Sequence, residues 1–243
     1  MLEIVEVIER STQGKTRPFI CRGDDDAVYF VKGCDAGKRS LICEWICGCL
    51  ARHWQLPIPD FEIAYVPPQL MSGPKTLELS DLGSGPVFAS KRRRGTELSW
   101  HSAQTVPPKM KQDVLLFDWW IKNGDRTLTA HGGNPNLFWA PDAQELVVID
   151  HNVAIDATVT SDNFFIDHVF CDQASAVVDD LVTRAEYTRR MNAAMARWDA
   201  IIESIPDEWR YLDTEQLDPV AFDWSAAYAL LTAFESNDFW AIR

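Results

Sequence analysis

The sequence predicts an α+β protein that begins with strands and continues mainly as helices. Short apolar runs bounded by turn residues dominate up to about residue 31, a pattern typical of strands. From about Pro107 onward, apolar residues recur at helical spacing. Two further apolar runs near residue 140 flank a turn and indicate a hairpin. With 243 residues, 47% of them hydrophobic, the chain can bury one full core or form two lobes.

The first part combines strands with one helix. The strands are expected at Ile4–Ile8, Pro18–Cys21, Val28–Val31, Phe61–Val66 and Gly85–Lys91. Between them, apolar residues at helical spacing predict a helix over Arg39–His53. Pro57 and Pro59 follow this helix and direct the chain into an extended run.

The second part is expected to form helices around one hairpin. A helix over Met110–Lys122 supplies two adjacent tryptophans as core residues. The hairpin pairs Leu137–Trp139 with Leu146–Ile149 across a turn at 140–143. Residues 174–204 are helical in pattern, and a last helix is expected over Trp224–Glu235.

Charge and hydropathy exclude several classes of protein. The net charge of −13 predicts a surface that repels nucleic acid and anionic membranes. No apolar run approaches the ~20 residues of a membrane span. The first residues lack the basic and apolar regions of a signal peptide, so we expect a cytoplasmic protein.

The cysteines and one basic run are candidate binding groups by residue type. The six cysteines lack paired zinc-ligand spacing, and we expect them to be buried, reduced thiols. The basic run Lys91–Arg94 fits an ordinary solvated face. Beside a nucleotide site, it could instead hold a phosphate or an acidic substrate segment.

The segment from residue 118 to 156 has the character of a site. Asn123 and Gly124 form a turn after an apolar helix, so Asp125 can face a cleft. Asn136 leads into the first hairpin strand and Asp150 follows the second, so the three polar side chains can converge. Such a set can hold Mg²⁺ and orient a hydroxyl for phosphoryl transfer. The alternative is that these residues only stabilise turns.

Two histidines in the same segment allow another interpretation. His131 and His151, with Asp125 and Asp150, could bind a transition metal for hydrolysis. Neither histidine has a partner at helical i,i+4 spacing, and a histidine in a loop is more often solvated or capping a turn.

Several strings in this segment resemble one family. They are Gly124-Asp125-Arg126, Asn134-Pro135-Asn136-Leu137-Phe138-Trp139 and Ile149-Asp150-His151. They are similar to the catalytic and metal-binding loops of HipA-like serine/threonine kinases, relatives of the lipid kinases. The likeness covers most of the chain. It implies a bilobal protein-kinase-like fold with a β-rich lobe at 1–90 and a helical lobe at 91–243.

The resemblance implies a role for each site residue. Asp125 would be the catalytic residue, and Asp150 would bind Mg²⁺ together with an asparagine. Asn134 and Asn136 lie nine and eleven residues beyond Asp125, a longer spacing than the family's usual one. Asn136 is preferred as the metal ligand because it directly precedes the strand, and Asn134 is the alternative.

The resemblance also implies how ATP is held. Lys32, which ends a strand, would contact the phosphates, and Glu44 in the next helix would hold its ammonium. A loop at 11–16 with the single glycine Gly14 would cover the phosphates. Backbone groups of Phe88, Ala89 and Ser90 would bind adenine. An ordinary hairpin loop at 11–16 is equally compatible with the sequence.

The expected activity is therefore transfer of a phosphoryl group from ATP, with Mg²⁺, to a protein serine or threonine. A lipid or small-molecule hydroxyl is the open alternative for the acceptor. The long spacing and the single glycine also fit a kinase-like pseudoenzyme that binds a nucleotide or a partner. An antitoxin-type partner protein is compatible with the resemblance.

Overall fold

A computed structural model describes residues 1–12, 17–72 and 78–241. The chain divides into two compact units, and each is described by itself. The first unit comprises Met1–Trp45, Pro59–Arg93 and Ser204–Phe222. The second unit comprises Ile46–Ile58, Arg94–Glu203 and Asp223–Arg243. The lobe boundary at residue 90 stays a prediction.

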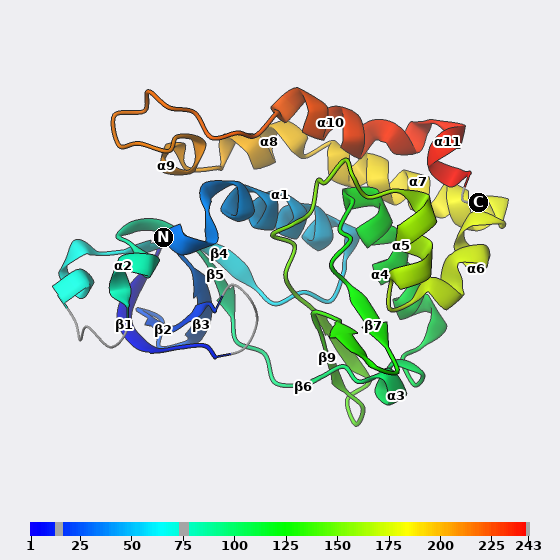
Figure 1. Ribbon diagram of the computed structural model, residues 1–243, viewed down its shortest axis with the longest axis horizontal. Coiled ribbons are helices and arrows are strands. Elements are labelled where there is room, and N and C mark those ends of the chain that lie inside the picture. Colours follow the sequence, from blue (N-terminus) through cyan, green and yellow to red (C-terminus); the bar gives the residue numbers. More distant parts are fainter. Residues whose placement is uncertain (13–16, 73–77, 242–243) are drawn as a thin grey trace. The chain divides into compact units, whose positions relative to one another are not determined.

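The strands of the first unit close into a barrel in the order β1-β2-β3-β5-β4 among the described residues (Figure 1). Their bounds are β1 Leu2–Arg10, β2 Phe19–Gly23, β3 Val28–Lys32, β4 Phe61–Val66 and β5 Gly85–Lys91. Neighbouring strands are antiparallel, except that β1 and β4 pair in parallel where Leu2 lies opposite Ala64. This parallel pair closes the barrel.

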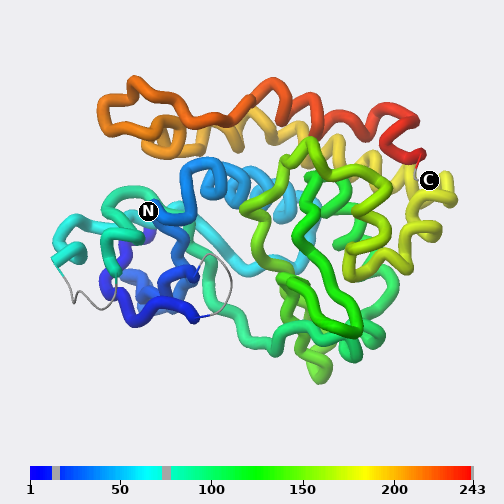
Figure 2. Tube along the Cα trace, viewed as in Figure 1, coloured from blue at the N-terminus to red at the C-terminus, as the bar shows by residue number. Residues whose placement is uncertain are grey.

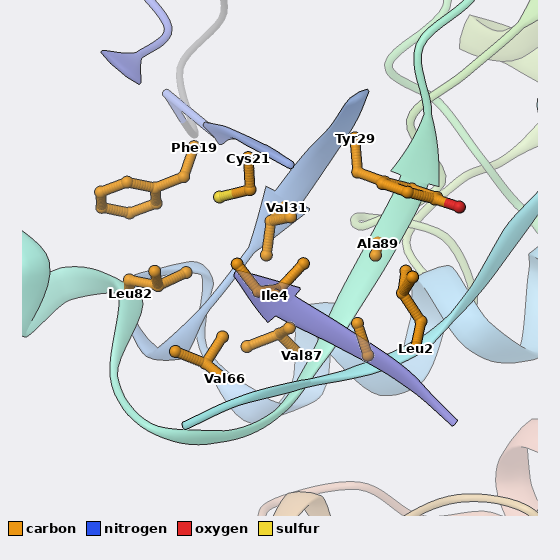
Figure 3. Packing of buried hydrophobic residues seen from close by; sticks show 11 residues of the cluster. Leu2, Ile4, Phe19, Cys21, Tyr29, Val31, Val66, Leu82, Val87 and Ala89 are labelled. Carbon is orange, nitrogen blue, oxygen red and sulfur yellow. The ribbon is translucent and has the colours of Figure 1, made fainter. Parts of the chain in front are cut away.

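Alternating side chains from the strands fill the barrel. Ile4, Phe19, Val31 and Ala89 lose all contact with water, and Figure 3 shows the side chains of this core converging from separate strands. The core forms because every second residue of a strand points to the same face. Each expected strand of the first part is present, with ends that differ from the prediction by at most two residues.

The described part of the first unit contains mainly short helical segments. They are α2 Leu79–Leu82, α9 Asp207–Arg210 and the first part of α1 Lys38–Trp54, whose later residues belong to the second unit. Segment 204–222 is bound by side chains from elsewhere in the unit. Trp209 is buried and its Nε1 donates to the carbonyl of Pro86 at 2.9 Å, and Trp45 donates to the Ser204 hydroxyl at 2.8 Å.

The second unit is mainly helical. Its further helices are α3 Trp100–Ala103, α4 Pro108–Ile121, α5 Ser161–Asp167, α6 Ala174–Val178, α7 Leu181–Met195, α8 Trp198–Glu203, α10 Trp224–Thr232 and α11 Asn237–Trp240. Trp120 on α4 is fully buried, and its ring stacks on that of Trp54 at 5.4 Å between centroids. Trp119 is also buried, so both tryptophans of α4 are core residues as expected.

Two small sheets accompany these helices. One has the strand order β10-β9-β6, and the other pairs β7 with β8. Their bounds are β6 Thr96–Glu97, β7 Thr127–Thr129, β8 Gly132–Asn134, β9 Leu137–Ala140 and β10 Glu145–Val148. The expected hairpin is present as β9 and β10, whereas β6, β7 and β8 were not predicted.

The expectation for the cysteines is correct for four of them. Cys21, Cys43, Cys47 and Cys49 are buried, but Cys34 is exposed and Cys171 is half-buried. All six are free thiols. Cys34 lies in a 3-10 turn rather than on a strand or helix face, which is why it reaches the surface. In the described residues, no helix combines the length and apolarity that a bilayer crossing requires.

Candidate functional site

Lys32 and Glu44 form an ion pair inside the first unit. Lys32 is the last residue of β3, and Glu44 lies in the second turn of α1. Their side chains retain only 11% and 3% of their accessible surface. A carboxylate with so little access to water needs a cationic partner, and the pairing fixes where the Lys32 ammonium lies.

The other expected nucleotide contacts stay predictions. Gly14 lies outside the described residues. Phe88, Ala89 and Ser90 lie within β5, with β3 on one side and β4 on the other. Their backbone groups therefore face neighbouring strands. The adenine contact stays a prediction, and it would require groups that already belong to the sheet.

Asp125 is placed by the end of helix α4. Lys122 caps the helix with a φ of 53°, and the chain then turns sharply. Asn123, which is fully buried, donates from Nδ2 to Asp118 Oδ1 at 2.9 Å and accepts the Asp125 N–H at 3.4 Å. The turn leaves the Asp125 side chain half-buried.

The hairpin of β7 and β8 explains the long spacing between Asp125 and the asparagines. Thr127 pairs with Asn134, so the chain leaves Asp125 and returns beside it (Figure 2 shows the green part of the chain doubling back). Asn134 Nδ2 donates to Asp125 Oδ2 at 2.7 Å. Asn136 Nδ2 approaches the same oxygen at 3.4 Å. Both candidate asparagines are thus brought to Asp125, and Asn134 makes the closer contact.

Asp150 lies after β10, and the residue before it, Ile149, is hydrogen-bonded to Asn136. The N–H of Ile149 donates to the carbonyl of Asn136 at 3.1 Å, which ties the start of β9 to the end of β10. Asn136 and Asp150 have left-handed φ values of 48° and 62°. Asn and Asp tolerate this conformation better than other residues with a side chain.

A buried ionic network, which the sequence interpretation missed, holds these segments. Arg126 and Asp118 are both fully buried, and Arg126 Nε donates to Asp118 Oδ2 at 2.6 Å. The other end of the guanidinium, Nη1, donates to three carbonyls: those of Pro135 at 3.2 Å, Asn136 at 2.7 Å and Ile149 at 3.1 Å. The residue next to Asp125 thereby contacts both segments that carry the other site residues.

His168 completes the network from a distant part of the chain. Its Nε2 lies 3.0 Å from Asp118 Oδ2, and its Nδ1 accepts the N–H of Phe170 at 3.1 Å. Since Nδ1 is an acceptor, the ring proton is on Nε2 and is donated to Asp118. Burial lowers the pKa of His168, and the hydrogen bond to Asp118 only partly opposes this, so the ring is neutral.

The charge in this network is that of Asp118 and Arg126. Burial alone would raise the pKa of Asp118, but the guanidinium of Arg126 and the hydrogen bond from His168 together hold it below its usual range. Asp118 is therefore ionised, and its charge is balanced by Arg126. One feature of the sequence pointed to such a pair, because Asp118 interrupts an apolar helix between Phe117 and Trp119.

Comparison with known proteins gives a clear family assignment. The family model described as HipA-like kinase matches residues 4–243. The chain belongs to the HipA-like kinase family. No curated protein matches the chain at a significant level.

The alternative interpretation was a transition-metal site that includes His131 and His151. Among the described residues, no three His, Cys, Asp or Glu side chains gather as a metal site. His131 is exposed at the tip of the β7–β8 hairpin. His151 is buried, with its ring centroid 5.8 Å from that of Phe117. The two histidines therefore do not form the transition-metal centre that a hydrolase would need.

Proposed function

We propose that this HipA-like kinase transfers the γ-phosphoryl group of ATP, with Mg²⁺, to a hydroxyl. The observation that carries the proposal is the meeting of Asn134 and Asn136 at one carboxylate oxygen of Asp125. Asp150 directly follows Ile149, whose N–H is bonded to the carbonyl of Asn136. A carboxylate beside an asparagine and a second carboxylate is the minimal set for this chemistry.

Asp125 would orient the acceptor hydroxyl and accept its proton. Asn134 donates a hydrogen bond to Asp125 Oδ2, and this bond fixes the plane of the carboxylate. We therefore place the incoming proton on Oδ1. Lys32 would contact the ATP phosphates. Its ion pair with buried Glu44 would hold the ammonium in place for this contact.

Asn136 and Asp150 would hold the metal. They provide an amide oxygen and carboxylate oxygens, which are the donors that Mg²⁺ prefers, and both side chains are half-buried rather than sealed. The metal would neutralise charge on the phosphates as the bond to the leaving group breaks. Asn134 is the alternative ligand, since Nδ2 of both asparagines is directed to Asp125 and this contact does not separate them.

The acceptor is proposed as a serine or threonine of a protein, in line with the family resemblance. The fold is proposed as bilobal and protein-kinase-like, which fits a strand-rich N-terminal region and a helix-rich C-terminal region. A pseudoenzyme was suggested by the long spacing after Asp125. The β7–β8 hairpin weakens that suggestion, because it brings the chain back to the carboxylate.

The test compares Asp125→Asn with Asp150→Asn. Asp125→Asn should lower phosphoryl transfer by about 10²-fold or more, because the proton acceptor is lost, while Mg²⁺·ATP binding stays near wild type. Asp150→Asn should weaken Mg²⁺-dependent ATP binding and transfer together, because a metal ligand is lost. Radiolabel transfer and calorimetric titration measure the two quantities.

The control is Asp142→Asn, which removes the same charge from the exposed turn of the β9–β10 hairpin. It should change neither quantity. If wild-type protein binds ATP and shows no phosphoryl transfer above a sample without protein, the chain is a pseudoenzyme. A measurable rate that neither site variant changes would overturn the assignment of these residues. If Asp150→Asn leaves Mg²⁺-dependent binding intact, the metal has been assigned to the wrong residue.

A further inference from the structure

Arg126 makes contacts in two opposite directions at once. Nε and Nη2 engage the two carboxylate oxygens of Asp118, at 2.6 Å and 3.3 Å. Nη1 bonds the carbonyls of Pro135, Asn136 and Ile149. Its side chain has no access to water, so none of these bonds competes with solvent. The planar guanidinium therefore joins helix α4 to the ends of β9 and β10.

The carbonyls that Arg126 binds include those of the peptide groups that adjoin Asn136 and Asp150. One belongs to Asn136 itself, and another belongs to Ile149, immediately before Asp150. Both site residues have left-handed backbone conformations. Such conformations persist only where surrounding contacts fix the neighbouring peptide planes. A donor that binds both peptide planes fixes the two residues relative to each other.

The guanidinium is itself held in place. Asp118 accepts bonds from Arg126, from His168 Nε2 and from Asn123 Nδ2, so its carboxylate cannot rotate. The backbone of Arg126 is also anchored, because its carbonyl accepts the N–H of Val169 at 3.0 Å. The chain that carries His168 thus fixes both ends of Arg126.

We propose that Arg126 is a positioning residue that sets Asn136 and Asp150 as one pair of oxygen donors, with Asp118 and His168 holding its guanidinium. The inference rests on the proposed function for the metal-binding role of the pair. Arg126 makes no contact with substrate in this scheme. It acts through the two carbonyls, and a point-like ammonium could not reach both Asp118 and these carbonyls.

Arg126→Lys tests the proposal, with Arg190→Lys as the matched control. Arg190 also bridges a carboxylate, that of Asp113, and a backbone carbonyl, that of Trp54, in the same unit. Neither of these groups belongs to the candidate site. Arg126→Lys should weaken the binding of Mg²⁺ in the presence of ATP by about 10- to 100-fold. It should also lower kcat more than it raises the KM for ATP. Arg190→Lys should leave both near wild type.

A second measurement does not depend on activity. Hydrogen exchange of peptides from 134–152 should rise at least severalfold in Arg126→Lys and stay unchanged in Arg190→Lys, because the Ile149 N–H bond to Asn136 depends on this anchoring. Should Arg126→Lys fail to fold, His168→Phe provides the same test, since it removes one support of Asp118 and should produce a smaller change in the same direction.

The outcomes separate the two proposals. Wild-type protein that neither binds Mg²⁺·ATP nor transfers phosphate would overturn the proposed function, while exchange in 134–152 would still decide whether Arg126 positions these segments. Folded Arg126→Lys protein with unchanged exchange in 134–152 overturns the positioning role. Unchanged Mg²⁺ affinity and kcat in an active enzyme would overturn it equally.

Discussion

A carboxylate without access to water, such as that of Asp118, is stable only if its charge is balanced and its oxygens are bonded. Arg126 supplies the charge, while Asn123 and His168 supply further hydrogen bonds. The balance depends on His168 staying neutral, because its Nδ1 must accept the N–H of Phe170. Protonation would place a donor where an acceptor is required.

His168 should therefore make the fold sensitive to mild acid. Its folded pKa lies below the ordinary value of about 6.5, so the unfolded chain binds more protons below that pH, and stability falls as the pH falls. The loss should reach at most about 1.4 kcal/mol per pH unit. Urea denaturation between pH 7.5 and 5 should show this slope in wild-type protein.

His168→Gln should flatten the slope, because glutamine can donate to Asp118 but does not titrate. His101→Gln, at an exposed position of the same unit, should retain most of the slope. If His168→Gln loses stability with acid as steeply as the wild type, then His168 does not resist protonation in the fold.

At the scale of elements, local pattern predicted what was long or strongly periodic. The helix at 38–54 and the β9–β10 hairpin were expected within about two residues of their ends, since apolar periodicity reports the buried face directly. The strands of the β7–β8 hairpin have three residues each, and β8 contains two glycines, so no periodicity or strand propensity marks it. Because this hairpin was not predicted, the spacing of Asn134 and Asn136 from Asp125 along the sequence looked too long for one site.

Gly133 is the position at which this hairpin should be most sensitive. A Cβ there would lie 2.4 Å from the carbonyl oxygen of Thr127 and 2.8 Å from the Cα of Leu128, both backbone atoms that cannot rotate away. Gly133→Ala should lower the free energy of unfolding by about 1–3 kcal/mol. It should also reduce phosphoryl transfer, because Asn134 would move away from Asp125.

Ala130→Ser is the matched control, because it adds one atom at an exposed position of the same hairpin. Denaturation and transfer assays on both variants give the comparison. A Gly133→Ala protein with wild-type stability would mean that β7 and β8 can separate without cost, and the hairpin would then not be what brings Asn134 to Asp125.

At the scale of the whole molecule, the order of residues along the chain does not show which of them fold together. The lobe boundary at residue 90 follows the change from strand to helix patterns, and the site residues 125, 136 and 150 were likewise grouped because they are close in sequence. His168 and the segment Ser204–Phe222 could not be assigned in this way, because only tertiary contacts connect them to Asp118 and to the first unit. Sequence periodicity carries no information about such distant partners.

The segment 204–222 should stabilise the first unit. Trp209 has no exposed surface and bonds to Pro86, and the carbonyl of Glu208 accepts the Lys38 ammonium at 2.8 Å. A fragment of residues 1–93 should therefore unfold at a lower temperature and less cooperatively than it does with a synthetic peptide of residues 204–222. Burying one tryptophan contributes several kcal/mol, as the cost of about 3–5 kcal/mol for its truncation indicates.

Calorimetry of fragment 1–93 alone, with the peptide, and with a Trp209→Ala peptide measures this dependence. The wild-type peptide should bind and raise the melting temperature in proportion to its concentration, since a ligand that binds only the folded state stabilises it. The Trp209→Ala peptide should have a smaller effect, because it loses the fully buried tryptophan and keeps Ile205, which is also buried. A fragment that unfolds cooperatively at the same temperature in all three samples would show that the barrel folds without the C-terminal segment, and the boundary near residue 90 would then describe an independent folding unit.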